Sequence, residues 1–161
     1  MLSLREFLDE DTDLLKKWLN NDHVKIWYER PEIDLYLENW LEEVQKRDAE
    51  YSWISYFIVQ QNERPIGFGM YYDCYNANED WYHIESEGEM FSIDYLIGDL
   101  TYIGRGYGKK MLKLLISSIK DNTPAKRIVV QPHEDNHSSC AVLLSTGFNF
   151  DTSKKYYYMD I

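Results

Sequence analysis

The sequence predicts an α/β (α+β) fold with a mixed central sheet of about six to seven strands flanked by about four helices. In several short segments apolar residues alternate with polar ones, which indicates strands, and in others they recur every three or four residues, which indicates helices. These segments follow one another in the order βααβββαβαββ. Successive strands favour antiparallel pairing in the front half, and the strand-helix-strand order favours a parallel pair in the back half. The 161 residues, 44% of them apolar, suffice for one domain spanning 1–161.

The front of the chain combines one predicted strand with two predicted helices. Residues 2–8 alternate well enough for the strand, and the polar residues 11–13 offer N-caps for the first helix. The second helix is predicted after Pro31. Its apolar residues at mostly helical spacing are Leu35, Leu37, Trp40, Leu41 and Val44. Residues 24–29, between the two helices, are interpreted as an aromatic-rich connector.

The middle of the chain predicts three strands. Residues 53–60 and 65–73 have strand composition, and the polar residues 61–64 between them predict a hairpin turn. A long polar loop follows, and residues 90–97 predict the next strand.

The back of the chain alternates helices and strands. Residues 108–120 predict a helix, and residues 127–131 predict a short buried strand. Asn136 can cap a last helix that ends at Gly147, where a glycine C-cap is expected. The closing strands are predicted at 148–150 and 156–159.

The overall charge restricts the kind of partner. The chain carries 17 Lys plus Arg against 28 Asp plus Glu, a formal net charge of −11. Such a surface repels phosphate backbones and anionic headgroups, so we expect no nucleic acid and no membrane as partner, and favour small cationic molecules. Cys74 and Cys140 have no metal-like or CxxC spacing and are expected to be free thiols. No signal peptide or apolar run of ~20 residues is present, which predicts a cytoplasmic protein.

The charges are segregated along the chain. Residues 72–99 contain eight acids and no Lys or Arg, whereas residues 104–127 contain seven basic residues and one acid. These counts alone fit a solvated loop followed by an ordinary amphipathic helix. They also fit a loop that attracts cations beside a turn that attracts anions.

The glycine turn at residues 103–108 favours the second interpretation. Its glycines let consecutive backbone N–H groups face one point, and the start of the following helix adds a positive dipole, so a phosphate or pyrophosphate is the expected ligand. Arg105 and Lys109 would add full positive charges. A Walker A loop would need Gly at 103 and Ser or Thr at 110, and a dinucleotide GxGxxG would need Gly at 109. The chain meets neither requirement.

With the strand at 90–97, the glycine turn and the helix after it, the chain resembles the GNAT superfamily of acetyl-CoA-dependent N-acetyltransferases. The superfamily signature [Arg/Gln]-x-x-Gly-x-[Gly/Ala] matches residues 103–108, with Ile103 where Arg or Gln is usual. The resemblance implies acetyl-CoA (CoA) as cofactor, with its pyrophosphate on the turn and its pantetheine along the end of the strand. The implied cofactor-binding residues are Leu96, Ile97, Gly98, Ile103, Gly104, Arg105, Gly106, Tyr107, Gly108, Lys109 and Asn136. Asn136 is equally suited to capping the last helix.

Further segments are similar to the aminoglycoside 6′-N-acetyltransferase branch of this superfamily. They comprise residues 17–19, 67–69, 92–98, 131–136 and 145–148. Two positions depart from that branch. Gln131 stands where the branch often has an Asp that contacts substrate, and Leu143 stands where a Tyr is proposed to protonate the departing CoA.

Asp94 is the candidate catalytic residue. Attack on a thioester requires a neutral amine, and an alkylamine needs about 4 kcal/mol to lose its proton at pH 7. A carboxylate on the strand that holds the thioester can accept this proton, directly or through water. The resemblance places the branch's proposed base at Asp94. The alternative is that Asp94 only orients a cationic substrate or is a charge at the sheet edge.

Acidic and aromatic side chains suit a cationic substrate, because carboxylates pair with ammonium groups and aromatic rings stack on a sugar or another ring. On these grounds the candidate substrate-binding residues are Trp27, Tyr28, Asp73 and Trp81, and the resemblance adds Gln131. His133 and His137 lie around a proline-containing loop without an HExxH frame, so we expect no metal.

The sequence therefore predicts transfer of an acetyl group from acetyl-CoA to a primary amine of a small polycationic acceptor, aminoglycoside-like, by direct attack in a ternary complex. Two alternatives stay open. One is the same fold with another acceptor, namely a siderophore precursor, a polyamine or a protein amine. The other is a catalytically weak acyl-CoA-binding module. We expect a monomer or a homodimer.

Overall fold

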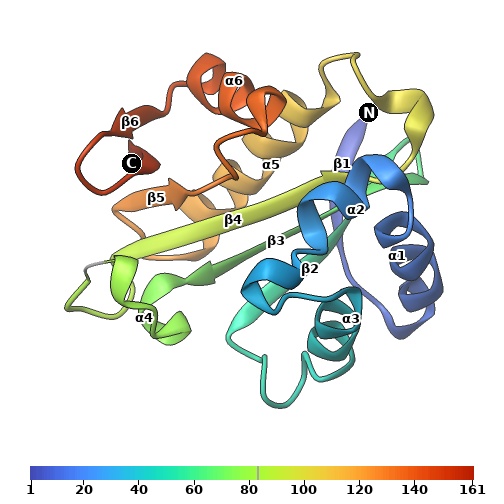
Figure 1. Ribbon diagram of the computed structural model, residues 1–161, viewed down its shortest axis with the longest axis horizontal. Coiled ribbons are helices and arrows are strands. Elements are labelled where there is room, and N and C mark those ends of the chain that lie inside the picture. The colour runs from blue at the N-terminus through green and yellow to red at the C-terminus, as the bar shows by residue number, and fades with distance from the viewer. Residues whose placement is uncertain (83) are drawn as a thin grey trace.

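The computed structural model describes residues 1–82 and 84–161, and for Trp81 the main chain alone. Within these residues the chain forms a seven-stranded mixed sheet in the order β1-β2-β3-β4-β5-β7-β6, with helices on both faces (Figure 1). The strands are β1 (Leu2–Glu6), β2 (Ile54–Gln61), β3 (Arg64–Asp73), β4 (Met90–Ile97), β5 (Arg127–Val130), β6 (Asn149–Asp151) and β7 (Tyr156–Asp160). The α-helices are α1 (Thr12–Leu19), α2 (Asp22–Tyr28), α3 (Leu37–Gln45), α4 (Cys74–Ala77), α5 (Tyr107–Asn122) and α6 (His137–Thr146). This arrangement confirms the predicted fold class.

Strands β1 to β4 form an antiparallel meander. The turn between β2 and β3 has positive φ angles at Asn62 (49°) and Glu63 (71°), as in the primed turns that match the twist of paired strands. The register places Tyr56 opposite Met70 and Met70 opposite Asp94. Because residues directly opposite one another share a sheet face, these three side chains form one row across β2, β3 and β4.

The parallel pair β4 and β5 is short. Met90, Phe91 and Ser92 pair with the first three residues of β5, and β4 then continues to Ile97 while β5 ends at Val130. In the part of the chain that the structure describes, the second half of β4 pairs on its β3 side alone. The sheet therefore has an open backbone edge near its centre.

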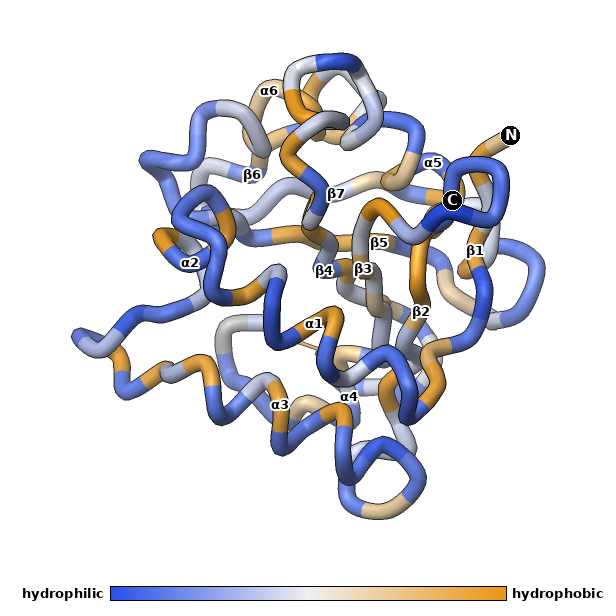
Figure 2. Tube along the Cα trace, turned by 90° about the vertical axis from the view of Figure 1, so that its right-hand side faces the viewer, coloured by the Kyte–Doolittle hydropathy of each residue, from blue (hydrophilic) through white to orange (hydrophobic). Residues whose placement is uncertain are grey.

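The helices cover the sheet in two layers. Figure 1 shows α1, α2 and α3 gathered on one side of β4 and α5 and α6 on the other. The first layer packs on Tyr56, Met70 and Leu96, and the second packs on Phe91 and Ile93. Figure 2 shows α1 and α3 alternating between hydrophobic and hydrophilic residues, as expected of helices with one buried face. None of the described helices is both long enough and apolar enough to cross a membrane.

Two predicted features of the first layer differ from the structure. Residues 24–29 do not form a connector, because helix α2 occupies Asp22–Tyr28. The helix predicted after Pro31 begins at Leu37. Before it, Arg30 and Leu35 exchange backbone hydrogen bonds of 2.8 and 3.0 Å, and Asp34 has a φ of 58°, so this segment is a tight loop. The predicted total of about four helices omitted α2 and the short helix α4.

Candidate active site

The open edge of β4 presents alternate backbone groups. The N–H of Gly98 donates to the Ile66 carbonyl at 2.8 Å, so in this antiparallel ladder the backbone groups of Leu96 and Gly98 face β3. Those of Tyr95 and Ile97 therefore face the open edge. Of the three residues Leu96, Ile97 and Gly98 predicted to pair with pantetheine, Ile97 alone turns its backbone toward that edge. The Gly98 N–H is bonded to β3 and the backbone of Leu96 faces the same way, so Leu96 and Gly98 do not meet the expectation that their backbone N–H groups pair with pantetheine.

Side chains from the α1–α2 region close over this edge. The Tyr28 hydroxyl donates to the Tyr95 carbonyl at 2.9 Å, and Nε2 of His23 lies 2.8 Å from the Ile97 carbonyl oxygen. The amide of Asn21 donates to the Gly98 carbonyl at 3.2 Å. Helix α2, missed in the sequence, therefore holds the end of β4.

The predicted phosphate turn lies beside the open half of β4. Gly104 and Gly106 have φ angles of 72° and 81°, and a Cβ built on either would meet no atom of the described residues within 4 Å. Gly106 is the N-cap of α5, whose first-turn N–H groups have no acceptor within the helix. A Cβ on Gly108 would lie 3.9 Å from the side chains of both Ile97 and Tyr95. The turn is thus an open cradle that fits a pyrophosphate next to the strand that would hold pantetheine.

The remaining predicted cofactor residues occupy distinct positions around this turn. Arg105 donates to the Thr101 carbonyl at 3.0 Å, and its guanidinium lies over the ring of Tyr107. Ile103 is exposed and Lys109 is half-buried. The side-chain oxygen of Asn136 accepts the Ser139 N–H at 3.2 Å, so Asn136 caps α6.

Asp94 lies on the face of β4 covered by α2 and α3. The Tyr28 hydroxyl donates to its Oδ1 at 2.5 Å. Burial raises the pKa of Asp94 to about 6, while the Tyr28 hydroxyl and the Tyr95 backbone N–H act in the opposite direction. The carboxylate is therefore held in place and ionised at neutral pH, with a pKa close enough to 7 for proton transfer.

Two of the predicted substrate-binding residues have a different role in the structure. Tyr28 is buried and its hydroxyl is committed to Asp94 and Tyr95, so it does not present its ring for stacking. The oxygens of Asp73 accept the backbone N–H groups of Tyr75 and Gly88 at 3.0 and 2.7 Å. Asp73 is 6% exposed. It orders the loop after β3, and we leave it out of the substrate site.

The other predicted substrate residues are spread more widely. Trp27 is half-buried, and its ring centroid lies 5.9 Å from that of His133. Both line a hollow of about 520 Å³ between α2 and the loop before α6. Gln131 donates to the Lys155 carbonyl at 3.0 Å and so lies at the β7 side of the sheet. The side chain of Trp81 lies outside the described residues. Leu143, where the branch has a Tyr, is fully buried in the core under α6.

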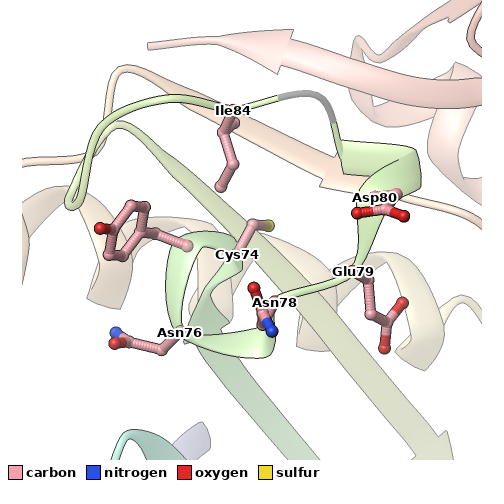
Figure 3. A pocket seen from close by; sticks show the side chains of 7 residues that line it. Cys74, Asn76, Asn78, Glu79, Asp80 and Ile84 are labelled. Carbon is pink, nitrogen blue, oxygen red and sulfur yellow. The ribbon is translucent and has the colours of Figure 1, made fainter.

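A second hollow, of about 420 Å³, lies around α4 (Figure 3). It is lined by Cys74, Tyr75, Asn76, Asn78, Glu79, Asp80 and Ile84. The Cys74 side chain is 1% exposed and burial raises the pKa of its thiol well above its usual range, so it is no nucleophile. Asp94 lines neither of the two hollows.

Sequence reasoning missed Glu43. This residue of α3 accepts a hydrogen bond from the Tyr56 hydroxyl at 2.7 Å, in the row of side chains that ends at Asp94. Burial, with a smaller contribution from the charge on Asp94, raises the pKa of Glu43 to about 7, and the hydrogen bond from Tyr56 opposes this shift. In the sequence, Glu43 is an acidic residue in a predicted amphipathic helix, and such a residue is typical of the solvent-exposed face.

Comparison with known proteins defines the class. The acetyltransferase (GNAT) domain family matches residues 7–155, and the chain belongs to this family. It is therefore a GNAT N-acetyltransferase, which confirms the enzyme class predicted from the sequence, and acetyl-CoA is the acetyl donor that this class implies. The glycine cradle, the start of α5 and the open edge of β4 are the features of this chain that fit that cofactor.

Individual proteins similar to this chain include aminoglycoside acetyltransferases. The chain is 23% identical over 151 residues to aminoglycoside N(6′)-acetyltransferase type 1 of Klebsiella pneumoniae, covering 91% of this chain and 73% of the relative. The structure of AAC(6′)-Ib with ribostamycin and coenzyme A matches with a TM-score of 0.83 and 20% identity, covering 99% and 93% of the two chains. The aminoglycoside N(6′)-acetyltransferase of Legionella pneumophila matches with a TM-score of 0.74 and 21% identity, covering 99% and 91%. These structural likenesses concern the fold.

Proposed function

We propose that this enzyme acetylates a primary amine of a small polycationic acceptor, aminoglycoside-like, by direct attack on acetyl-CoA in a ternary complex. One observation carries the proposal: a carboxylate with a pKa of about 6, Asp94, lies on the same half of β4 whose open edge adjoins the glycine cradle. A proton acceptor and a thioester site therefore belong to one strand.

The chain's own groups divide the binding of acetyl-CoA between them. Backbone N–H groups at Gly104, Gly106 and the start of α5 would hold the pyrophosphate, with positive charge from Lys109. The backbone N–H of Ile97 would pair with pantetheine, since the Ile97 carbonyl oxygen already faces His23. When bound, acetyl-CoA supplies the acetyl group as an activated thioester.

Asp94 accepts the proton that the attacking amine must lose. At pH 7 the carboxylate is mostly ionised, because its pKa is about 6. It attracts the protonated amine, takes its proton directly or through water, and so generates the nucleophile within the site. Tyr28 keeps Oδ1 fixed during this step by donating a hydrogen bond to it.

The acceptor class is supported by charge and by the relatives. Residues 72–99 carry eight acids and no Lys or Arg, and this excess of negative charge favours a cationic ligand, although the carboxylates of Asp73 and Asp99 are engaged within the protein. The named relatives act on aminoglycosides, which are polycationic amines. A polyamine would meet the same charge requirement, whereas a siderophore precursor or a protein amine would meet it to a smaller extent.

The test is release of the CoA thiol across a panel of amines. The panel contains kanamycin, ribostamycin, spermidine, a hydroxylamine-bearing siderophore precursor and a lysine peptide, and a reaction without amine gives the background. We expect the aminoglycosides to give the highest kcat/KM. If no aminoglycoside were turned over above background and another amine were, that amine would define the acceptor class instead. If neither acetyl-CoA nor CoA raised the melting temperature, binding of the cofactor itself would be contradicted.

A further inference from the structure

We propose that Glu43 forms, with Asp94, a two-carboxylate acceptor site that selects a diamine, with one nitrogen at Asp94 and a second ammonium group at Glu43. This inference rests on the proposed function and names the substrate class of the same site. It concerns a substrate-binding residue on α3, a helix that the sequence analysis did not connect with binding.

The sheet register brings the two carboxylates together. Tyr56, Met70 and Asp94 lie directly opposite one another on β2, β3 and β4. Adjacent strands are about 4.8 Å apart, so the backbones of Tyr56 and Asp94 are roughly 10 Å apart on one face. The Tyr56 hydroxyl reaches up to Glu43 at 2.7 Å and thereby holds the Glu43 carboxylate over this row. The negative charge on Asp94 contributes to raising the pKa of Glu43, so the two carboxyl groups are close enough to interact.

The two carboxylates are held in the same way. Asp94 accepts a hydrogen bond from the Tyr28 hydroxyl and Glu43 accepts one from the Tyr56 hydroxyl. Each carboxylate therefore accepts a hydrogen bond from an uncharged hydroxyl group. Among the hydrogen bonds of the described residues, none uses Oε2 of Glu43, so this oxygen is available to a ligand.

Positive partners are present nearby but are engaged elsewhere. The described ion pairs include neither Glu43 nor Asp94. Lys46 pairs with Glu42 at 2.7 Å on the outer face of α3, and Arg47 pairs with Asp9 at 2.6 Å. Without a cation beside it, Glu43 is about half protonated at pH 7, because its pKa is about 7. A ligand with two ammonium groups would compensate both carboxylates in their charged form. A ligand with one ammonium group leaves one carboxylate uncompensated.

The experiment compares two sugars that differ in one amine. The probes are methyl 2,6-diamino-2,6-dideoxyglucoside and methyl 6-amino-6-deoxyglucoside, titrated by calorimetry into the complex of the enzyme with CoA, where no turnover is needed. The variants are Glu43→Gln, which keeps an acceptor for Tyr56, and the matched control Glu42→Gln on the exposed face of the same helix. A third variant, Tyr56→Phe, releases the Glu43 carboxylate without altering it.

We expect the unmodified enzyme to bind the diamine about tenfold more tightly than the monoamine, in line with one charge-assisted contact. Glu43→Gln should abolish this preference, Tyr56→Phe should reduce it, and Glu42→Gln should leave it intact. The affinities for the diamine and the monoamine are compared on the same variant, so a general loss of packing in that variant affects both and leaves their ratio unchanged.

Two outcomes overturn the inference: an unmodified enzyme without preference between the probes, or a Glu43→Gln variant that retains the full preference. Because the readout is binding, it separates from the proposed function. Selective binding of the diamine with no acetylation of it would contradict the proposed reaction and leave the two-carboxylate site supported.

Discussion

The Tyr28 hydroxyl and the Asp94 carboxylate, 66 positions apart in sequence, meet at 2.5 Å above the open half of β4. The same hydroxyl lies 2.9 Å from the carbonyl oxygen of Tyr95. One side chain of α2 thus positions both the proposed base and the neighbouring backbone of the strand that would hold the thioester. This link gives α2 a direct influence on the protonation of Asp94.

Replacing Tyr28 with Phe should raise the pKa of Asp94 above 6. The Tyr28 hydrogen bond stabilises the charged form of Asp94 and opposes the effect of burial, so its loss favours the protonated form. The acid limb of the kcat/KM–pH profile should therefore move to higher pH, with the largest loss of activity below pH 7. The matched control is Tyr71→Phe, which removes a hydroxyl bonded to Ser118 on the other face of the sheet. An unchanged profile for Tyr28→Phe would contradict this assignment.

Replacing Asp94 with Asn should lower turnover and increase stability at high pH. Loss of a general base reduces kcat by about 100-fold or more. The native pKa of about 6 exceeds the ordinary value of 3.8, so the folded protein binds this proton more tightly than the unfolded chain. The stabilisation is complete below pH 4 and is lost as the pH rises through 6.

Above pH 7 the variant lacks this cost, so its free energy of unfolding should exceed that of the unmodified enzyme by on the order of 1–2 kcal/mol. Thermal melts at pH 3.5 and pH 8 measure the difference, which should vanish at the lower pH. Asp99→Asn is a control of opposite sign, because Asp99 pairs with Arg64 and hydrogen bonds lower its pKa. Full turnover by Asp94→Asn would remove Asp94 as the base.

The periodic segments of the fold could be predicted from sequence, because local patterns determine them. The strand at 90–97 was predicted with its observed bounds, and the last helix was predicted from its cap at Asn136 to Gly147, which has a φ of 109°. Helix α2 was missed because its seven residues include Val, Ile, Trp and Tyr, which are weak helix formers. Contacts with β4 stabilise it, through Tyr28 and His23, and local sequence carries no trace of those contacts.

Some residues of the candidate site could likewise be predicted from sequence, and others could not. The glycine turn could be found because its residues are contiguous and need positive φ angles. Asp94 could be found through its strand position and the resemblance. Glu43 could not, because its relation to Tyr56 and Asp94 depends on the register of three strands and the packing of α3. Asp73 was misjudged because a sequence does not show that an acid is consumed by backbone N–H groups.

Replacing Gly98 with Ala should destabilise the fold. A Cβ at this position would lie 2.0 Å from Cδ2 of Trp18, so α1 or the end of β4 must move. We expect a loss of about 1–3 kcal/mol in the free energy of unfolding, measured by urea titration. The matched control is Gly108→Ala, where the nearest atoms are 3.9 Å away and a helical position favours Ala. Equal stability of both variants would contradict the tight contact between Trp18 and Gly98.

Replacing Gly104 with Ala should weaken binding of CoA more than it weakens the fold. The new methyl group meets no protein atom, yet it occupies the cradle proposed for the pyrophosphate, and the φ of 72° adds strain. We expect about a tenfold rise in the Kd for CoA by calorimetry, equivalent to about 1.4 kcal/mol. Gly88→Ala has a similar backbone angle of 83° far from the turn, next to Pro124, and controls for strain. An identical rise in Kd for both variants would assign the effect to strain.

The order of the strands in the sheet has a consequence for the growing polypeptide. Strands β1 to β4 neighbour one another in the order in which they are synthesised, so each finds its partner already made. The row from Tyr56 to Asp94 and the helices above it belong to this early portion. Strand β6, in contrast, pairs among the described residues with β7 alone, which is synthesised after it. The acceptor side is therefore synthesised before the glycine turn and α5, and the second face of the sheet stays uncovered until α5 has been made.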